Sequence, residues 1–133
     1  MINLTEIRLT VAIVGTAIAK WLGGFDGLIE TLVAFMIVDY VTGILCAVVE
    51  KNLSSAIGFK GIAQKCLILF LVGMANSVDK HILGGSDNLL RTAVIFFYLS
   101  NEGISILENA ARLGLPIPDK LRDILSQLKN KGK

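Results

Sequence analysis

The sequence has few of the residues from which catalytic and metal-binding sites are usually built. It contains a single histidine, His81, and two cysteines, Cys46 and Cys66, whose spacing matches no metal-binding or redox motif. No second histidine, ligand cluster or paired nucleophile and base is present. We therefore expect a protein that is not an enzyme and that holds no metal ion and no cofactor. The two thiols should behave as small buried hydrophobes, and the histidine should lie in a surface connection.

Charged residues are also scarce. They make up 18% of the 133 residues, whereas 53% are hydrophobic and the mean hydropathy is +0.67. A typical soluble domain carries about a quarter charged residues. The net charge of +2 is too small and too scattered for a nucleic-acid-binding surface. Since the length fits one domain, we expect a single membrane domain over residues 1–133, with the lipid bilayer and not nucleic acid as its partner.

Four apolar segments are each about as long as the ~20 residues that a helix needs to cross a bilayer. They lie near residues 5–22, 27–49, 64–83 and 89–111. The first keeps only Leu9–Ala19 uninterrupted, so it either spans the bilayer with Lys20 reaching the surface or lies in the interface. Its leader, with Glu6 beside Arg8, is barely basic, which favours a retained helix over a cleaved signal peptide. The expected fold class is all-α, an integral membrane protein with four, alternatively three, transmembrane helices.

The positively charged residues indicate an orientation in the membrane. With four spans and both termini in the cytoplasm, ten of the thirteen Lys and Arg residues lie inside. Lys51, Lys60 and Lys65 stand between the second and third segments, and we expect them to anchor this connection at the membrane surface by contact with anionic headgroups. If the first segment does not cross, this connection and the C-terminal tail stay inside all the same.

A separate amphipathic helix is expected at the C-terminus, over residues 118–130. Gly114 and two prolines end the fourth segment, and Pro118 followed by Asp119 suits the start of a helix. Four apolar residues then share one face at helical spacing: Leu121, Ile124, Leu125 and Leu128. Such a helix would lie on the cytoplasmic leaflet or pack against another subunit, and the pattern does not choose between the two.

Asp39 lies almost in the middle of the second apolar segment. A carboxylate near the bilayer midplane costs roughly 2.5–3.5 kcal/mol on insertion scales, so it seldom faces lipid. Gly43 and Ala47 follow it at intervals of four residues, and small residues at this spacing let two helices approach closely. Asp39 therefore either orients one helix against its neighbour within a subunit, or belongs to an oligomer contact or a pore lining.

The fourth segment carries a polar face along one side. Five residues on this side are candidates for contact with protein or water: Tyr98, Asn101, Glu102, Ser105 and Glu108. Lipid cannot satisfy such a face, so it must be covered by protein or wetted by water. It forms a buried seam inside one subunit, a seam between subunits, or a surface that meets water in an open state. Together with Asp39, Gly43 and Ala47, these five residues are our candidates for oligomer contacts or pore lining.

Several motifs in order resemble the holins of phage lysis and toxin secretion, a family of small proteins from Gram-positive phages and clostridia. They are DYVTG at residues 39–43, SSAIGFKGIAQK at residues 54–65, Asp79 near the end of the third segment, and the polar pattern of the fourth segment with its Leu115-Pro116-x-Pro118 exit. The similarity covers roughly residues 28–118. No single motif is specific, but their order and spacing together are.

The resemblance implies a protein that accumulates in the bacterial cytoplasmic membrane and assembles with copies of itself. At a set time such proteins open lesions, through which an endolysin, or in some loci a toxin, leaves the cytoplasm without having to bind the holin. The resemblance implies no catalytic role for any residue. That Asp39 or the polar face with Glu102 would line the wall of a lesion is our own inference.

Two other function classes fit the same residues. A small ion channel or transporter subunit would move an ion past Asp39 or Glu102. A non-conducting scaffold would use the polar seams for assembly only. Cargo size separates the first of these from a holin, because a holin releases a folded enzyme and kills its host.

Overall fold

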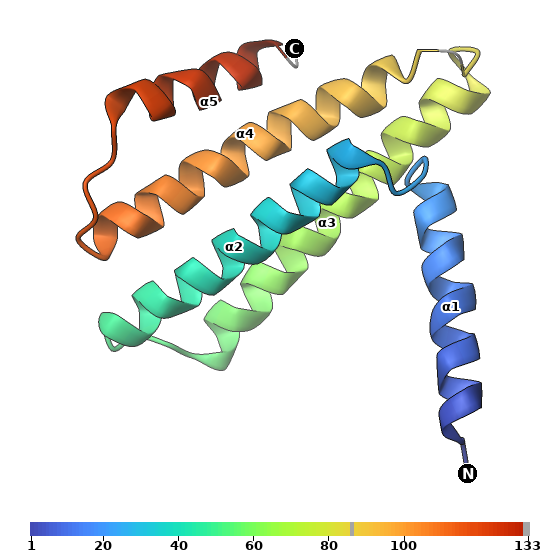
Figure 1. Ribbon diagram of the computed structural model, residues 1–133, viewed down its shortest axis with the longest axis horizontal. Coiled ribbons are helices and arrows are strands. Elements are labelled where there is room, and N and C mark those ends of the chain that lie inside the picture. Colours follow the sequence, from blue (N-terminus) through green and yellow to red (C-terminus); the bar gives the residue numbers. More distant parts are fainter. Residues whose placement is uncertain (86, 132–133) are drawn as a thin grey trace.

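The computed structural model describes residues 1–85 and 87–131, and in these residues it is all-helical (Figure 1). Its five helices are α1 (Leu4–Trp21), α2 (Gly27–Val49), α3 (Ser55–His81), α4 (Leu89–Arg112) and α5 (Asp119–Lys131). The all-α prediction is confirmed, and the helices follow the order of the predicted segments. The last two residues of the C-terminal tail, 132 and 133, lie outside the described residues.

Side chains that cap the helices explain where three of them begin. Asn3 and Glu6 form a reciprocal capping box at the start of α1. Asp26 accepts a hydrogen bond from the backbone N–H of Ile29 at the start of α2, and Ser54 does the same for Ile57 at the start of α3. Each cap satisfies a backbone donor that has no partner within the helix.

Helix α3 begins earlier than expected. We predicted a segment near 64–83, preceded by a connection, but the helix runs from Ser55 to His81. The cap at Ser54 starts it, and no proline interrupts the residues that follow. Lys60 and Lys65 therefore lie on a helix, and the connection between α2 and α3 is reduced to residues 50–54.

Helix α4 is the central helix of the molecule. It packs against α2, α3 and α5, whereas α2 and α3 touch each other over a much smaller surface. In Figure 1, α4 runs between the α2–α3 pair and α5. The main apolar contact lies among α2, α3 and α4, with Ile29 and Leu32 of α2, Val72 of α3 and Ile95 of α4 fully buried. Three neighbours thus surround the most polar of the long helices.

Helix α1 projects from the bundle and has no buried residue (Figure 1). Its last residue, Trp21, packs against α3, where its ring meets Gly73 and lies edge-on to Phe70. The chain then turns into α2 through Gly23 and Gly24, whose φ angles of +93° and +97° favour glycine. The contact at Gly73 therefore fixes one end of α1 and leaves the rest without a partner in the described chain.

Two helices in the described chain, α2 and α3, are long and apolar enough to cross a membrane. By composition, the prediction of four spans is therefore met by two of the four segments, and the crossing of α1 and α4 stays a prediction. Glu6, Arg8 and Lys20 interrupt α1, and four charged residues interrupt α4: Arg91, Glu102, Glu108 and Arg112. The apolar stretches of α2 and α3 are only 22% and 17% buried, so most of their side chains point outward. A core helix of a soluble protein would be mostly buried.

A polar cluster between three helices as the candidate functional site

The ammonium group of Lys65 joins α2, α3 and α4. From α3, its Nζ donates to Asp39 Oδ2 on α2 and to both carboxylate oxygens of Glu102 on α4, at 2.8 and 2.7 Å. The side chains of Asp39 and Glu102 are 11% and 5% exposed, and that of Lys65 is 19% exposed. We call Asp39, Lys65 and Glu102 the ionic cluster. It brings together the two carboxylates that were predicted from the sequence to lie on separate polar faces.

Asn109 completes the coordination of Asp39. Its Nδ2 donates to Asp39 Oδ1 at 3.1 Å and to Thr42 Oγ1 at 2.9 Å. The hydroxyl of Thr42 in turn donates to the backbone oxygen of Val38. Glu102 and Asn109 are seven residues apart on α4, so two helical turns place them on the same side, facing α2. Both oxygens of Asp39 are therefore hydrogen-bonded within one subunit.

The charges of the ionic cluster do not balance. With all three groups ionised, two carboxylates share one ammonium, which leaves one negative charge between the helices. A charged group is costly to remove from water unless it is paired with an opposite charge and hydrogen-bonded. Removing Lys65 would leave two carboxylates without a cation, so the stability of the cluster depends on this side chain.

Two open grooves border the ionic cluster. One, of about 410 Å³, lies at the end of the bundle where α2 ends and α3 begins, and Gly43, Ala47, Lys60 and Arg112 line it together with Asp39 and Lys65. The other, of about 470 Å³, runs between α3 and α4, and Gln64, Tyr98, Asn101 and Ser105 line it together with Lys65 and Glu102. Both grooves present polar groups on the outside of the three-helix contact.

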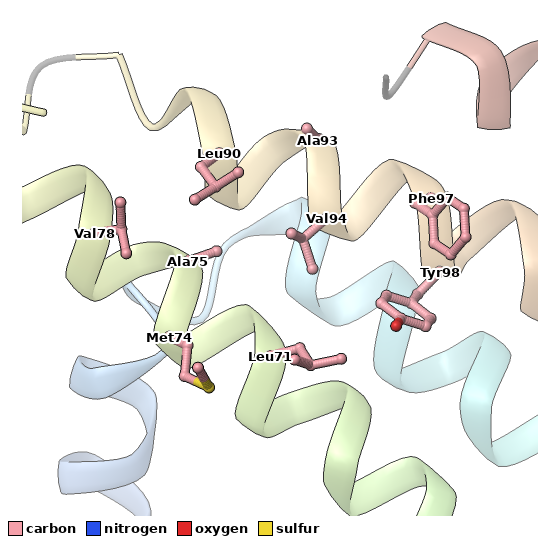
Figure 2. Close-up of a pocket in the computed structure, with 9 residues that line it drawn as sticks. All are labelled: Leu71, Met74, Ala75, Val78, Leu90, Ala93, Val94, Phe97 and Tyr98. Carbon is pink, nitrogen blue, oxygen red and sulfur yellow. The ribbon is translucent and has the colours of Figure 1, made fainter.

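An apolar groove of about 460 Å³ continues along the same α3–α4 seam (Figure 2). Leu71, Met74, Ala75 and Val78 of α3 face Leu90, Ala93, Val94, Phe97 and Tyr98 of α4. It shares Leu71 and Tyr98 with the second polar groove. The seam thus changes along its length from polar to almost purely apolar.

A second polar cluster lies at the opposite end of the bundle, around Arg91. This side chain is 1% exposed, and its guanidinium donates to the backbone oxygens of Leu22 and Gly24 and to both carboxylate oxygens of Asp26. Asp79 of α3 accepts from the backbone N–H groups of Leu90 and Arg91, at 3.0 and 2.8 Å, and so caps α4. These bonds tie the α1–α2 turn to the beginning of α4.

The pKa of Asp26 follows from this contact. The hydrogen bonds from Arg91 lower the pKa of the Asp26 carboxyl, and partial burial opposes the shift. At the other end of the bundle, hydrogen bonds from Arg112 lower the pKa of the exposed Glu50 carboxyl in the same way. Both carboxylates lie at helix ends, outside the apolar spans.

The other candidate residues are distributed around the ionic cluster. Ala47 is buried and Gly43 half-buried, and Tyr98, Asn101 and Ser105 are half-buried along the grooves. Glu108 is exposed. The proposed roles of all eight candidates in oligomer contacts or pore lining stay predictions, because the structure describes a single chain.

Three expectations need correction or completion. Lys65 was expected at the membrane surface, but it binds two carboxylates between the helices; Lys51 and Lys60 are exposed. The Cys46 thiol is buried and donates to the backbone oxygen of Asn109, whereas Cys66 is exposed, contrary to expectation. His81 is exposed, as predicted, but it is the last residue of α3 and not part of a connection. The role of Lys65 was missed because we placed it in a connection instead of on a helix.

The chain is similar to several proteins of Gram-positive bacteria and their phages. It is 44% identical over 125 residues to an uncharacterized protein of Clostridium perfringens, which covers 94% of this chain and 92% of the relative. It is 45% identical over 122 residues to an uncharacterized protein of Listeria innocua, covering 90% of this chain and 86% of the relative. No solved structure matches.

One relative carries a functional name. A probable holin of Bacillus phage phi105 is 33% identical over 97 residues, which cover 73% of this chain and 70% of that protein. In addition, residues 16–130 match the bacteriophage holin family, a range that takes in all of α2, α3 and α4. The chain therefore belongs to the bacteriophage holin family.

Proposed function

We propose that this protein is a holin that assembles with copies of itself in the bacterial cytoplasmic membrane and opens lesions in it. An endolysin, or a toxin, then leaves the cytoplasm through these lesions without having to bind the holin. The observation that carries the proposal is the match of residues 16–130 to the holin family. The similarity to a probable phage holin supports it.

The distribution of polar groups suits such a protein. The outward faces of α2 and α3 are apolar and can meet lipid, while Asp39, Lys65 and Glu102 satisfy one another inside the subunit. A subunit in this state inserts with these three charges turned away from lipid. Opening would separate α4 from α2 and α3 and turn the ionic cluster toward water, which is a change between two discrete packings.

The proposed topology follows the positive charges. The end of the bundle with Lys51, Lys60 and Arg112 lies in the cytoplasm, and the turn at residues 22–26 lies outside. Helices α2 and α3 cross by composition, and α4 crosses packed against both of them. With α1 crossing as well, both termini are cytoplasmic. A tag at the N-terminus that is accessible from outside intact cells would contradict the cytoplasmic position of the N-terminus.

Inducible expression in a bacterium that lacks its own lysis genes tests the function. The protein is expressed with and without an endolysin that has no export signal, and culture turbidity is followed over time. We expect abrupt lysis only when both are present. Steady growth with the protein at full level in the membrane would reject a holin.

A small ion channel or transporter subunit is the second candidate. The observation that favours it is the pair of open grooves beside the carboxylates of Asp39 and Glu102, where an ion could be bound. A channel would pass ions and retain the endolysin in the cytoplasm, so co-expression would not lyse the culture.

A further inference from the structure

The three grooves described above follow one another along the seam between α3 and α4. The first, at the end of the bundle where α3 begins, shares Gln64, Lys65 and Ser105 with the second. The second shares Leu71 and Tyr98 with the third, which is the apolar groove of Figure 2. We call the three together the α3–α4 groove. Its walls change along the two helices from charged through polar to apolar.

The charged end of the α3–α4 groove is mostly positive. Lys60, Lys65 and Arg112 line it, and Asp39 is the only carboxylate among the described residues of its wall. Lys65 is bound to its two carboxylates, and Arg112 pairs with Glu50 at the surface. Lys60 forms no salt bridge with any described residue. An anion at this end would therefore give Lys60 the partner that it lacks, with Arg112 beside it.

Neutral hydrogen-bonding groups follow in the middle of the groove. The side-chain amides of Gln64 and Asn101 line this part and form no hydrogen bond with a described residue. The hydroxyl-bearing side chain of Tyr98 lies beside them. Hydrocarbon chains offer such groups no partner, whereas the ester oxygens of a phospholipid can accept hydrogen bonds from them.

The apolar end has the length of an acyl chain. Figure 2 shows Leu71 of α3, and Val94 and Tyr98 of α4, pointing into the space between the two helices. From Gln64 to Met74, helix α3 rises about 15 Å. The hydrocarbon of one leaflet is also about 15 Å deep, half of the ~30 Å core. A chain whose ester lies at Gln64 therefore reaches well into the apolar groove.

The order of these parts matches a phospholipid of the cytoplasmic leaflet. In the proposed topology, Lys60 and Arg112 lie at the cytoplasmic surface, and the apolar end of the groove lies in the hydrocarbon. Anionic lipids of this leaflet attract basic side chains, and basic pockets between membrane helices bind their headgroups. Charge, polarity and length thus agree on one kind of occupant.

We propose that the α3–α4 groove binds one anionic phospholipid, with its phosphate at Lys60 and one acyl chain in the apolar groove of Figure 2. Bound in this way, the lipid joins α3 to α4 and satisfies the amides between its two ends. Lys51, which is exposed and does not line the groove, takes no part. The site rests on the proposed placement of these helices in the membrane, but it does not require that lesions open.

A matched pair of substitutions in the full-length chain tests the site. Lys60→Gln removes a charge that lines the groove, whereas Lys51→Gln removes an equally exposed charge outside it. The proteins are purified in detergent and titrated with phosphatidylglycerol, with phosphatidylcholine of the same acyl chains, with short-chain phosphatidylglycerol, and with inorganic phosphate. Native mass spectrometry counts the lipids and the protein chains in each complex.

We expect one phosphatidylglycerol per chain, bound about fivefold more weakly by Lys60→Gln, the factor that one lysine contributes at an anionic surface. Lys51→Gln should match the unaltered chain. Phosphatidylcholine should bind more weakly because it has no net charge, and the short-chain lipid because it cannot reach the apolar groove.

Four results would overturn the site. They are equal affinity of the two variants, equal binding of phosphatidylglycerol and either other lipid, binding of inorganic phosphate in place of lipid, and a lipid-free dimer, in which a second copy would cover the groove. None of them bears on lysis by the unaltered chain with an endolysin, so failure of the lipid site and failure of the holin proposal are distinguishable.

Discussion

Lys65 is the residue on which the three-helix contact depends most. It is the only cation bound to Asp39 and Glu102 in the described chain, and it reaches them from a third helix. Removing one partner of a buried ion pair strongly destabilises a protein, because the remaining charge stays buried without a partner.

Lys65→Met should therefore destabilise the protein by about 3–5 kcal/mol, the usual cost of leaving a buried charge unpaired. Lys60→Met, five residues earlier on the same helix, is the control, because Lys60 is exposed. Thermal unfolding in detergent, followed by circular dichroism, measures the difference. Equal melting temperatures for the two variants would show that the ionic cluster contributes nothing to the closed subunit.

Asp39→Asn combined with Glu102→Gln should bring lysis forward in the presence of an endolysin. The amides keep the shape of the side chains but leave the Lys65 ammonium without a counter-charge, so the closed packing loses stability. Glu108→Gln, on the same helix but exposed, should leave the timing unchanged. If the double variant reached normal levels and lysed on the normal schedule, these carboxylates would be irrelevant to triggering.

Asp26→Asn should lower stability at neutral pH and have little effect in acid. Arg91 lowers the pKa of Asp26, so the carboxylate stabilises the fold above its ordinary value of 3.8, and this contribution is lost as the pH falls through the lowered pKa. Asparagine still caps α2, so the substitution isolates the charge. Melting temperatures at several pH values should converge only as the pH falls below 3.8 towards the lowered pKa. A constant difference at all pH values would contradict the role of the charge.

The two carboxylates of the ionic cluster were predictable from the sequence, but their partner was not. Asp39 and Glu102 were conspicuous because lipid cannot satisfy them, and that argument needs no knowledge of the fold. Lys65 carried no such signal, since a lysine at the edge of an apolar segment usually reaches the membrane surface. Arg91 was missed for the same reason, and its burial depends on the turn formed by Leu22 and Gly24.

At the scale of the helices, boundaries were predictable where a cap or a breaker stands in the sequence. Helix α2 matches its predicted range of 27–49, α4 ends one residue later than predicted, and α5 both begins and ends one residue later than predicted. The start of α3 was misplaced by nine residues, because its first three turns are more polar than a lipid-facing segment should be. Hydropathy locates membrane segments, whereas helices can extend beyond them.

The contact between α1 and α3 gives a prediction at this scale. A methyl group added at Gly73 would overlap the ring of Trp21, whereas Gly61 on the same helix has open space. Gly73→Ala should therefore displace the end of α1, and Gly61→Ala should be neutral or stabilising by up to ~1 kcal/mol. Because Trp21 is the only tryptophan, its fluorescence maximum reports the change directly. Identical emission from both variants would show that α1 is not held by this contact.

At the scale of the whole molecule, the subunit hides its polar residues around a central helix. The sequence predicted an all-α membrane protein and two polar faces, but not that α4 would be enclosed by α2, α3 and α5. That arrangement depends on which helix packs against which, and no periodicity in a single sequence specifies it. The enclosure of α4 explains how a helix with four charged residues can pack beside the two apolar helices α2 and α3.

The size of what leaves the cell tests the central claim most directly. Cells that express the protein also carry a folded cytoplasmic enzyme the size of an endolysin, and the medium is assayed for that enzyme and for potassium during induction. A holin predicts a silent period followed by abrupt release of the enzyme together with potassium. Loss of potassium with the enzyme retained inside would contradict the account and indicate an ion channel.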